Sequence, residues 1–357
     1  MATIKHVFPG GNTSKGFYSY YNFLPPRDPN RIFVLKGGPG VGKSTFMKKV
    51  GDALLAEGYD IEHHHCSSDN NSLDGVTAPE LGVALVDGTA PHIVDPKYPG
   101  AVDELVDLGT FWNRASMEAN KPYIIRSTHE VSRLFARAYK YLEAAKLIAD
   151  DIAAKYTSCM EFDGVTALLH ELINELLTGP HFYKNGFRRH LFGSAYTPNG
   201  HIHYTDSLVG GLDRVYHVTG SAGTGKTTFL KQIADLASSY GYDVTYYHTP
   251  LIPDKLETII IHGLGVGMTT QRIEGFSYHK VINLEDHLDM NRFGAIKYEL
   301  DESLYNHINL LETAMKNIRM AKAEHDSLEK YYVPNMDFEA QQPKLVEVVS
   351  RILEYKN

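Results

Sequence analysis

The segment Gly37-Gly38-Pro39-Gly40-Val41-Gly42-Lys43-Ser44 decides how this sequence is interpreted. It follows an apolar run at 32–35 and continues through Thr45 into a stretch with helical periodicity, so the order is strand, glycine-rich loop, helix. The spacing G-x-x-x-x-G-K-S is the Walker A or P-loop pattern, in which glycines let backbone N–H groups approach phosphate oxygens. A helix N-terminus adds partial positive charge. The pattern predicts that Lys43 reaches the β- and γ-phosphates and that the Ser44 hydroxyl binds Mg²⁺.

The same pattern occurs a second time, as Gly220-Ser221-Ala222-Gly223-Thr224-Gly225-Lys226-Thr227. It again follows an apolar run, at 215–218, and it leads through Thr228 into a second stretch with helical periodicity. Two matches in the correct context are hard to explain by chance. We therefore expect two sites for nucleoside triphosphate, with ATP and Mg²⁺ as ligands and with Lys226 and Thr227 in the roles of Lys43 and Ser44.

The two patterns belong to an internal repeat. Lys43 and Lys226 are 183 residues apart, and nearly the same shift relates further segments in the same order. These matches pair FPGGNTSKG at 8–16 with FGSAYTPNG at 192–200, Gly58-Tyr59-Asp60 with Gly241-Tyr242-Asp243, His65 with His248, Asn113-Arg114 with Asn291-Arg292, and Met160-Glu161-Phe162 with Met336-Asp337-Phe338. The order indicates a tandem duplication over nearly the whole chain.

Each half alternates apolar strands with helices, which predicts an α/β fold with a parallel sheet in three α/β/α layers. The helices after the loops are expected at 44–57 and 227–240, and the next strands at 59–65 and 242–248. Each half then becomes helical. A capping-box pattern at 127–130 precedes a periodic run to about 155, with a second helix at about 164–177. The later half repeats this at about 303–331 and 341–355.

These patterns predict two P-loop NTPase domains. The first is expected at 1–186 with a helical hairpin at about 127–177, and the second at 187–357 with a hairpin at about 303–355. Each hairpin would pack on its own core or project from it. The alternative is that these helices simply cover the sheet.

Acidic residues distinguish the halves. Asp87 ends an apolar run at 81–86, the Walker B pattern, and is expected to hold Mg²⁺ beside Ser44. Its partner in the repeat is Thr270, which predicts two unequal sites unless Glu285 or Asp286 supplies the missing acid. Asp74 has an acidic counterpart, Glu257, and could position water or accept a proton, although turn-forming chemistry explains its surroundings equally well.

Two other groups of residues are weaker candidates. His63-His64-His65-Cys66 ends the second strand and could bind a soft metal, but alternation sends neighbouring side chains to opposite faces. We therefore favour a polar strand end near the substrate. Arg114 and Arg292 could stabilise charge across the two halves or form ordinary surface ion pairs.

Composition limits the classes of partner. The chain has 357 residues, 43% hydrophobic and 22% charged, which is typical of a globular protein with a sizeable core. The formal net charge of −8 gives no support for nucleic-acid binding. Two cysteines far apart predict no disulfide framework, and neither an apolar run of membrane-spanning length nor a signal-peptide pattern occurs. A cytoplasmic protein without a membrane partner is expected.

The segments FPGGNTSKGFYSYYNFL, LKGGPGVGKST, HHHCSSDNNSLDGV and GVALVDGTAPHIVDPKYPG together resemble a bacterial family of tandemly duplicated P-loop proteins, labelled ATPase or predicted nucleotide kinase. The resemblance spans almost the full chain and implies a P-loop NTPase fold for both halves. It implies no particular reaction, because the labels themselves depend on the P-loop.

The leading hypothesis is a Mg²⁺-dependent ATPase in which the state of ATP changes the arrangement of the halves. A kinase that transfers the γ-phosphate of ATP to a nucleotide or small molecule is the first alternative. An ATP-gated regulatory module with little turnover, acting on a protein or small-molecule partner, is the second. Fold alone does not choose among them.

Overall fold

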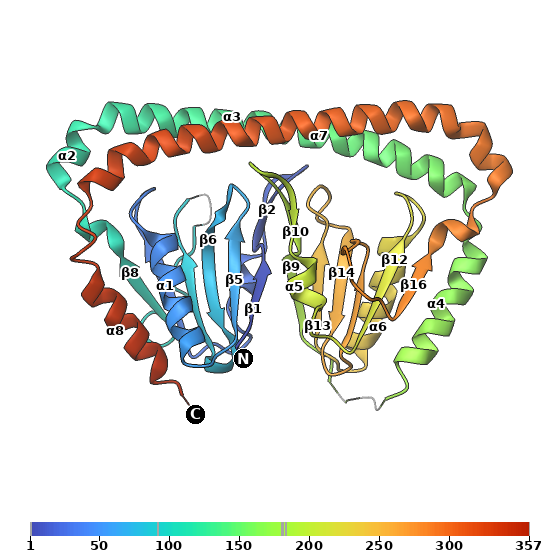
Figure 1. Cartoon of the computed structure of the whole chain (residues 1–357), viewed down its shortest axis with the longest axis horizontal. Coiled ribbons are helices and arrows are strands. Elements are labelled where there is room, and N and C mark those ends of the chain that lie inside the picture. Colours follow the sequence, from blue (N-terminus) through green and yellow to red (C-terminus); the bar gives the residue numbers. More distant parts are fainter. Residues whose placement is uncertain (1, 91–92, 180–181, 183, 357) are drawn as a thin grey trace.

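The computed structural model describes residues 2–90, 93–179, 182 and 184–356. Two six-stranded sheets stand side by side below a pair of long helices (Figure 1). The first sheet has the spatial order β1 (Ile4–Val7), β5 (Ile61–Cys66), β6 (Asp69–Ala78), β7 (Val83–Asp87), β4 (Arg31–Lys36), β8 (Asp103–Asp107). The second has the order β9 (Arg188–Phe192), β13 (Val244–His248), β14 (Leu256–Ile261), β15 (Val266–Thr269), β12 (Arg214–Thr219), β16 (Lys280–Asn283). The two orders correspond strand by strand, as the repeat predicts.

Both sheets are mixed, which corrects the prediction of fully parallel sheets. β6 is antiparallel to β5 and β7, and β14 is antiparallel to β13 and β15. The physical reason is the length of the connections. Only residues 67–68 separate β5 from β6, whereas a parallel pair requires a crossover of a dozen residues or more. Asp74, whose surroundings suggested a turn, therefore lies in the ten-residue strand β6.

Helices pack mainly on one face of each sheet. In the first half, α1 (Lys43–Ala56) buries Met47, Val50 and Leu54, spaced three to four residues apart, against Leu85 of β7. α6 (Lys226–Ser239) does the same in the second half.

The opposite faces are covered by irregular segments. In the first half, Ala84 and Val86 of β7 pack on Tyr21 and Leu24, from the 3-10 helix η1 (Tyr21–Phe23) and the residue that follows it. The equivalent place in the second half holds the five-residue helix α5 (Thr205–Val209). The third layer of the expected α/β/α sandwich is thus made of loops and short helical turns in the part of the chain that the structure describes.

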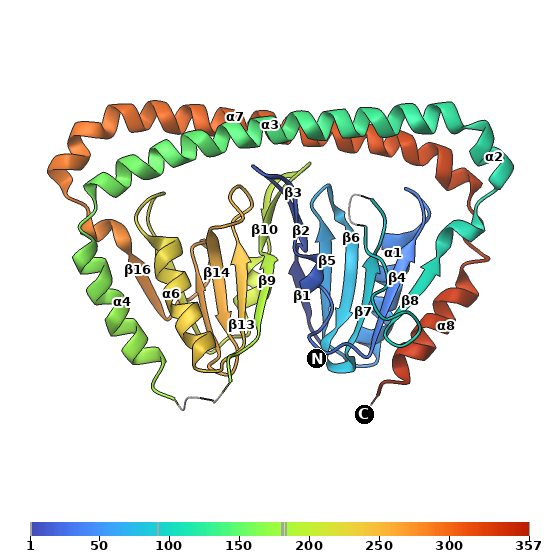
Figure 2. The same ribbon diagram turned by 180° about the vertical axis from the view of Figure 1, so that it is seen from behind.

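The two longest helices, α3 (Lys121–Cys159) and α7 (Met290–Tyr332), form an antiparallel pair above both sheets (Figures 1 and 2). At a rise of 1.5 Å per residue they are about 58 and about 64 Å long. Tyr123 stacks on Tyr331 near one end, with ring centroids 5.6 Å apart, and Lys155 lies 3.3 Å from Ser303 near the other. Each helix therefore extends over both halves of the molecule.

Both helices begin earlier than predicted. The capping-box residues at 127–130 lie inside α3, where the Thr128 hydroxyl donates to the Ile124 carbonyl one turn back. A short helix α2 (Arg114–Ala119) precedes α3. α7 begins at Met290, because the Asp289 side chain accepts from the N–H groups of Asn291 and Arg292. A serine or threonine that bonds to its own helix gives a false cap signal.

The shorter helices that follow α3 and α7 cross to the opposite half. α4 (Phe162–Leu176) places Leu169 and Leu172 in one core with Phe229 and Ile233 of α6. α8 (Gln342–Leu353) places Val348 and Ile352 in the core that α1 shares with the first sheet. This corrects the prediction of a hairpin on its own core. The apolar periodicity of α4 requires a partner surface but does not say which one, and α3 carries it beyond the first sheet.

The halves also meet directly. Phe8 and Phe192 exchange two backbone hydrogen bonds of 3.0 Å beside the hairpins β2–β3 (Gly10–Thr13, Gly16–Ser19) and β10–β11 (Ser194–Thr197, Gly200–His203). Arg189 donates to both carboxylate oxygens of Glu62, at 2.8 and 2.6 Å. Burial alone would raise the pKa of Glu62, but the charge and hydrogen bonds of Arg189 hold it well below its usual value. None of the described helices combines the length and apolar composition that a membrane crossing requires.

Candidate functional site

Two glycine loops, 37–42 before α1 and 220–225 before α6, have the same backbone conformation. Gly40 and Gly42 have φ angles of +67° and +92°, and Gly223 and Gly225 have +88° and +99°. These left-handed conformations strain any residue with a Cβ atom. Gly42 and Gly225 are the N-cap residues of α1 and α6, and neither helix has a side chain that accepts from its first N–H groups. Both helix N-termini therefore keep donors that an anion can use.

The two loop lysines fold back over their own loops. Lys43 Nζ donates to the carbonyl oxygens of Gly37 and Gly38, at 2.9 Å each. Lys226 Nζ donates to the carbonyl of Gly220 and, at 2.7 Å, to that of Ser221. Burial and the neighbouring charge of Lys255 lower the pKa of Lys226 to about 8, against an opposing effect of Glu285. A partly buried ammonium group beside free helix donors favours an anionic ligand.

Asp87 and Ser44 both lie beside the first loop. Asp87 ends β7, next to β4, and its Oδ2 lies 3.7 Å from Lys43 Nζ. Its Oδ1 accepts from the N–H and the hydroxyl of Thr89, at 2.9 and 2.5 Å. Burial raises the pKa of Asp87, and the charge of Lys43 opposes that effect. Ser44 Oγ accepts from the Leu73 N–H at 3.0 Å. A carboxylate and a hydroxyl on adjacent elements are hard oxygen ligands of the kind that Mg²⁺ prefers.

Asp74 lies deeper in the same site. It belongs to β6 and is buried beside Tyr21 and Cys66. Burial raises its pKa to about 6, although Tyr21, Cys66 and Lys43 favour its charged form. A carboxyl group with this pKa near a phosphate-sized anion site can accept a proton at neutral pH. The turn explanation for Asp74 is wrong, because the residue sits within a strand.

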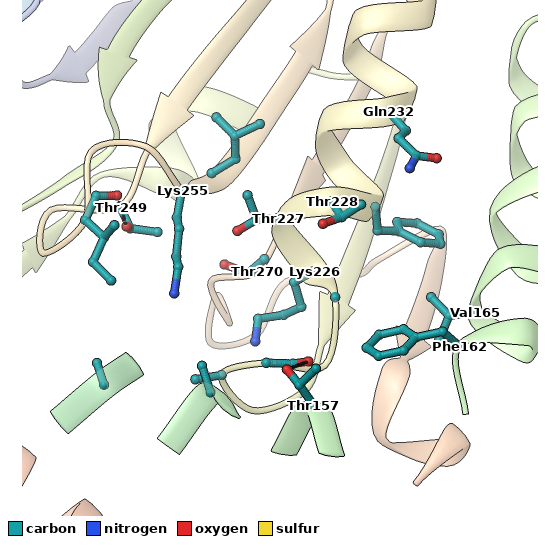
Figure 3. A pocket seen from close by; sticks show the side chains of 18 of the residues that line it. Thr157, Phe162, Val165, Lys226, Thr227, Thr228, Gln232, Thr249, Lys255 and Thr270 are labelled. Atoms are coloured by element: carbon teal, nitrogen blue, oxygen red, sulfur yellow. Dashed lines mark hydrogen bonds between the residues drawn. The ribbon is translucent and has the colours of Figure 1, made fainter. Parts of the chain in front are cut away.

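The second site differs at the position of Asp87. β4 pairs with β7, and β12 with β15, in equivalent register, and this places Thr270 where the first half has Asp87. A cavity of about 670 Å³ opens beside the second loop and is lined by Thr270, Thr227 and Thr228. Figure 3 shows Lys226 and Lys255 directed into this cavity from opposite sides, with Thr227 and Thr270 between them. Two cationic side chains and three hydroxyls suit an anion better than a metal ion.

Glu285 and Asp286 do not restore the missing acid in the same place. Both lie in the 3-10 helix η4 (Leu284–His287). Glu285 Oε1 accepts from the N–H and the hydroxyl of Ser221, at 2.7 and 2.5 Å, so it holds the second loop at Ser221. Asp286 Oδ1 accepts from Asn283 in its own turn, at 2.7 Å. The carboxylate near the second loop therefore serves the loop backbone.

Each glycine loop contacts residues that arrive from the opposite half. Thr157 of α3 donates to the Gly223 carbonyl at 3.0 Å, and Phe162 of α4 lies against Gly225. At the first loop, Val333 lies against Gly40, at the start of the 3-10 helix η5 (Val333–Asn335), and Phe338 lies against Gly42.

A smaller cavity of about 280 Å³ lies beside the first loop, lined by Thr45, Lys49, Phe338 and Gln341. Gln341 Nε2 donates to the Val41 carbonyl at 3.0 Å. Both cavities thus have one wall from each half of the chain.

The arginine candidates do not reach either loop. Arg114 pairs with Glu118 at 2.8 Å and Arg292 with Asp289 at 3.1 Å, each on the protein surface. Nor are they equivalent in the fold. Isolated β-bridges join Trp112 to Met336 and Met160 to Leu288. The two bridges are equivalent when the repeat is shifted by 176 residues in this region. Asp289 is therefore the counterpart of Asn113. The local ion-pair explanation is correct for both.

Sequence reasoning did not identify Phe162, Phe338 and Lys255 as site residues. The repeat contained a signal for the two phenylalanines, because both stand in the matched segments Met160-Glu161-Phe162 and Met336-Asp337-Phe338. Lys255 has Ser72 as its counterpart, and no motif marks it. Its position depends on the turn between β13 and β14.

Comparison of the chain with family models, curated proteins and solved structures finds no match. A function must therefore be inferred from the geometry of the two loops and their surroundings. In that geometry, free helix donors and a lysine lie at both loops, and the carboxylates of Asp87 and Asp74 lie beside the first.

Proposed function

We propose that this protein is a Mg²⁺-dependent P-loop ATPase with two unequal nucleotide sites, and that the state of ATP is coupled to the arrangement of the two halves. The observation that carries the proposal is the repeated glycine loop with a free helix N-terminus and a partly buried lysine. Backbone N–H groups of such a loop can hold the phosphates of ATP, with Lys43 and Lys226 turning from loop carbonyls onto phosphate oxygens.

Turnover is assigned to the first site. Ser44 and Asp87 would hold Mg²⁺, which neutralises charge that develops on the transferred phosphoryl group. Asp74, whose pKa is about 6, would accept a proton from the attacking water. The second site has Thr270 in place of Asp87 and is proposed to bind ATP with little hydrolysis.

The crossing helices supply a route for coupling. A nucleotide base beside the first loop would lie against Phe338, and a base beside the second loop would lie against Phe162. Both phenylalanines are joined within a few residues to α7 and α3. Binding at either loop would therefore draw a long helix of the other half toward it, and α3 and α7 pack on each other along their length.

A nucleotide titration tests the binding part of this proposal. Wild-type protein should bind about two ATP per chain in the presence of Mg²⁺, and Lys43→Ala and Lys226→Ala should each remove one. The exposed Lys231 of α6, which pairs with Asp235, provides a control, because Lys231→Ala should change neither site. A single site in wild type, abolished by Lys43→Ala alone, would disprove binding at the second loop.

Phosphate release tests the reaction. Release from ATP in water alone supports hydrolysis, whereas release or transfer that requires a nucleotide or small-molecule acceptor supports the kinase alternative. Binding of two ATP without turnover in either assay would leave the regulatory module. Asp74→Asn and Asp69→Asn separate the two acids of β6, because only the former should lower turnover far more than ATP affinity.

A further inference from the structure

Three histidines gather at the edge of the first sheet, in a place that the proposed ATPase does not use. His6 lies on β1 directly opposite His63 on β5, and His65 is two residues further along the same face of β5. One nitrogen from each ring lies within 4.8 Å of the other two. His64, between them, points to the opposite face and bonds to Thr77. Sequence alone did not suggest this group, because His6 stands more than fifty residues before the other two.

Hydrogen bonds determine which nitrogen of His65 carries the proton. His65 Nδ1 lies 2.9 Å from the carbonyl oxygen of Asn70, which can only accept, so Nδ1 is the protonated nitrogen. His65 Nε2 therefore has a free lone pair, and it faces His6 Nδ1 at 2.8 Å. A ring that donates through one nitrogen to a backbone carbonyl and presents the other to a neighbour is the usual arrangement of a metal-binding histidine.

The distance between His6 Nδ1 and His65 Nε2 suits a metal ion in place of the proton that these two nitrogens share. Two nitrogen ligands of a tetrahedral ion with bonds of about 2.0–2.1 Å stand about 3.3 Å apart, so His6 and His65 need to separate only slightly. The charged groups that act on the rings are Asp206 near His6 and Lys48 near His63.

The second half contains the same arrangement with one ligand removed. His190 Nδ1 and His248 Nε2 lie 2.9 Å apart at the positions of His6 and His65. The position of His63 is occupied by Tyr246, whose hydroxyl donates to Asp235. A tyrosine of the opposite half covers each histidine pair: Tyr204 lies 4.6 Å from His65, and Tyr20 lies 4.7 Å from His248, between ring centroids. The histidine pair is thus a shared feature of the interface, and His63 is particular to the first half.

We propose that His6, His63 and His65 bind one divalent transition-metal ion of the Zn²⁺ or Co²⁺ type through three imidazole nitrogens. Imidazole ligands select such ions over Mg²⁺ and Ca²⁺, which prefer oxygen. The backbone N–H of His6 also donates to the hydroxyl of Ser207 in the second half, at 3.1 Å, and Tyr204 covers the rings. The bound ion would therefore stabilise the contact between the halves. This site is independent of nucleotide binding.

Titration of chelator-treated full-length protein with Co²⁺ alone, without nucleotide, tests the proposal. We expect one Co²⁺ per chain with a visible absorption band, unaffected by excess Mg²⁺ and displaced by Zn²⁺. His63→Tyr installs the residue of the second half, which the fold accepts there, and should abolish binding. His190→Ala is the matched control and should leave one ion bound.

His6→Gln, at the sheet edge, provides a second test if His63→Tyr does not fold, and it should weaken binding at least tenfold. Failure of wild type to bind Co²⁺ would overturn the proposal. Retention of the ion by folded His63→Tyr, or its loss in His190→Ala, would also overturn it. ATP binding by the same preparations is measured separately, so failure of the metal site and failure of the proposed ATPase are distinguishable.

Discussion

The first and second glycine loops share a backbone but have different surroundings. Beside the first, Asp87 lies 3.7 Å from Lys43, and Asp74 is buried behind it. Beside the second, Thr270 takes the place of Asp87, and the cavity is lined by Lys255, whose counterpart in the first half is Ser72. The exchange removes a negative charge and adds a positive one. In the proposed function a cation would occupy the first site, whereas the second carries positive charge of its own.

In the proposed function, this difference would allow the second site to bind ATP without a metal ion. A metal ion beside a phosphate group chiefly supplies positive charge. A lysine at the same place can supply part of that charge for binding, but it cannot position an attacking water through a hydration shell as Mg²⁺ does. This contrast between the loops predicts distinct responses to mutation, pH and chelation.

Turnover should depend on the first loop. Asp87→Asn and Lys43→Ala should lower the rate of ATP hydrolysis by about 10²-fold or more, because each removes charge stabilisation that acts in the transition state. Asp87→Asn should leave most ATP binding intact. Lys226→Ala should retain far more activity. Steady-state rates at saturating Mg·ATP measure this order, and a slower Lys226→Ala enzyme would mean that the second loop is the catalytic one.

The stability of the fold should depend on pH through Glu257, the buried acid of β14. Glu257 is the counterpart of Asp74, and burial raises its pKa to about 7, against hydrogen bonds from Ser194 and Gln271. Because the folded-state pKa exceeds the unfolded value, the protonated form stabilises the fold at low pH. That stabilisation is lost as pH rises through 7.

Glu257→Gln removes this titration. At pH 8 it should raise the free energy of unfolding by about 3 kcal/mol relative to wild type, with the difference shrinking toward pH 4.5. Denaturant unfolding at several pH values measures it. Turnover should be unchanged, in contrast to Asp74→Asn. A difference that is constant with pH would show that Glu257 is not protonated on folding.

Metal dependence of binding should differ between the sites. With Mg²⁺ removed by a chelator, ATP should remain bound at the second loop and dissociate from the first. Lys255→Ser, which installs the residue of the first half, should weaken the chelator-resistant site about tenfold, since a charge-assisted contact is lost. Calorimetry in chelator measures this affinity.

The reciprocal variant Ser72→Lys provides the matched comparison, because it should reduce the Mg²⁺ requirement of the first site. Two sites that both lose ATP in chelator would contradict the assigned role of Lys255. So would a Lys255→Ser variant with unchanged affinity.

The smallest effects should come from the two phenylalanines that contact the glycine loop of the opposite half. Phe162→Ala should weaken ATP binding at the second loop, and Phe338→Ala at the first, each about fivefold, because a stacked aromatic contact contributes about 1 kcal/mol. Nucleotide titration in the background of Lys43→Ala or Lys226→Ala isolates each site. Tyr298→Ala, an exposed aromatic of α7, is a control that should change neither. Loss at the first loop in Phe162→Ala would contradict the crossed arrangement.

Local patterns along the chain were sufficient for several features. The apolar run, glycine spacing and periodic stretch around Lys43 and Lys226 predicted strand, loop and helix to within about two residues. The repeat made Thr270 the counterpart of Asp87, and the register of the strands confirms this correspondence. Such features depend on neighbours in sequence, through φ angles that only glycine accepts and through apolar spacing that one face of an element requires.

Other features were decided by packing over long distances. The apolar stripe of α4 fits a sheet surface, but which sheet it covers depends on how far α3 extends and on its pairing with α7. The same is true of His6, which meets His63 and His65 only because β1 pairs with β5, and of Phe338, which reaches Gly42 from nearly three hundred residues away. A periodic pattern states that a surface must be buried, and only the tertiary structure selects the surface that buries it.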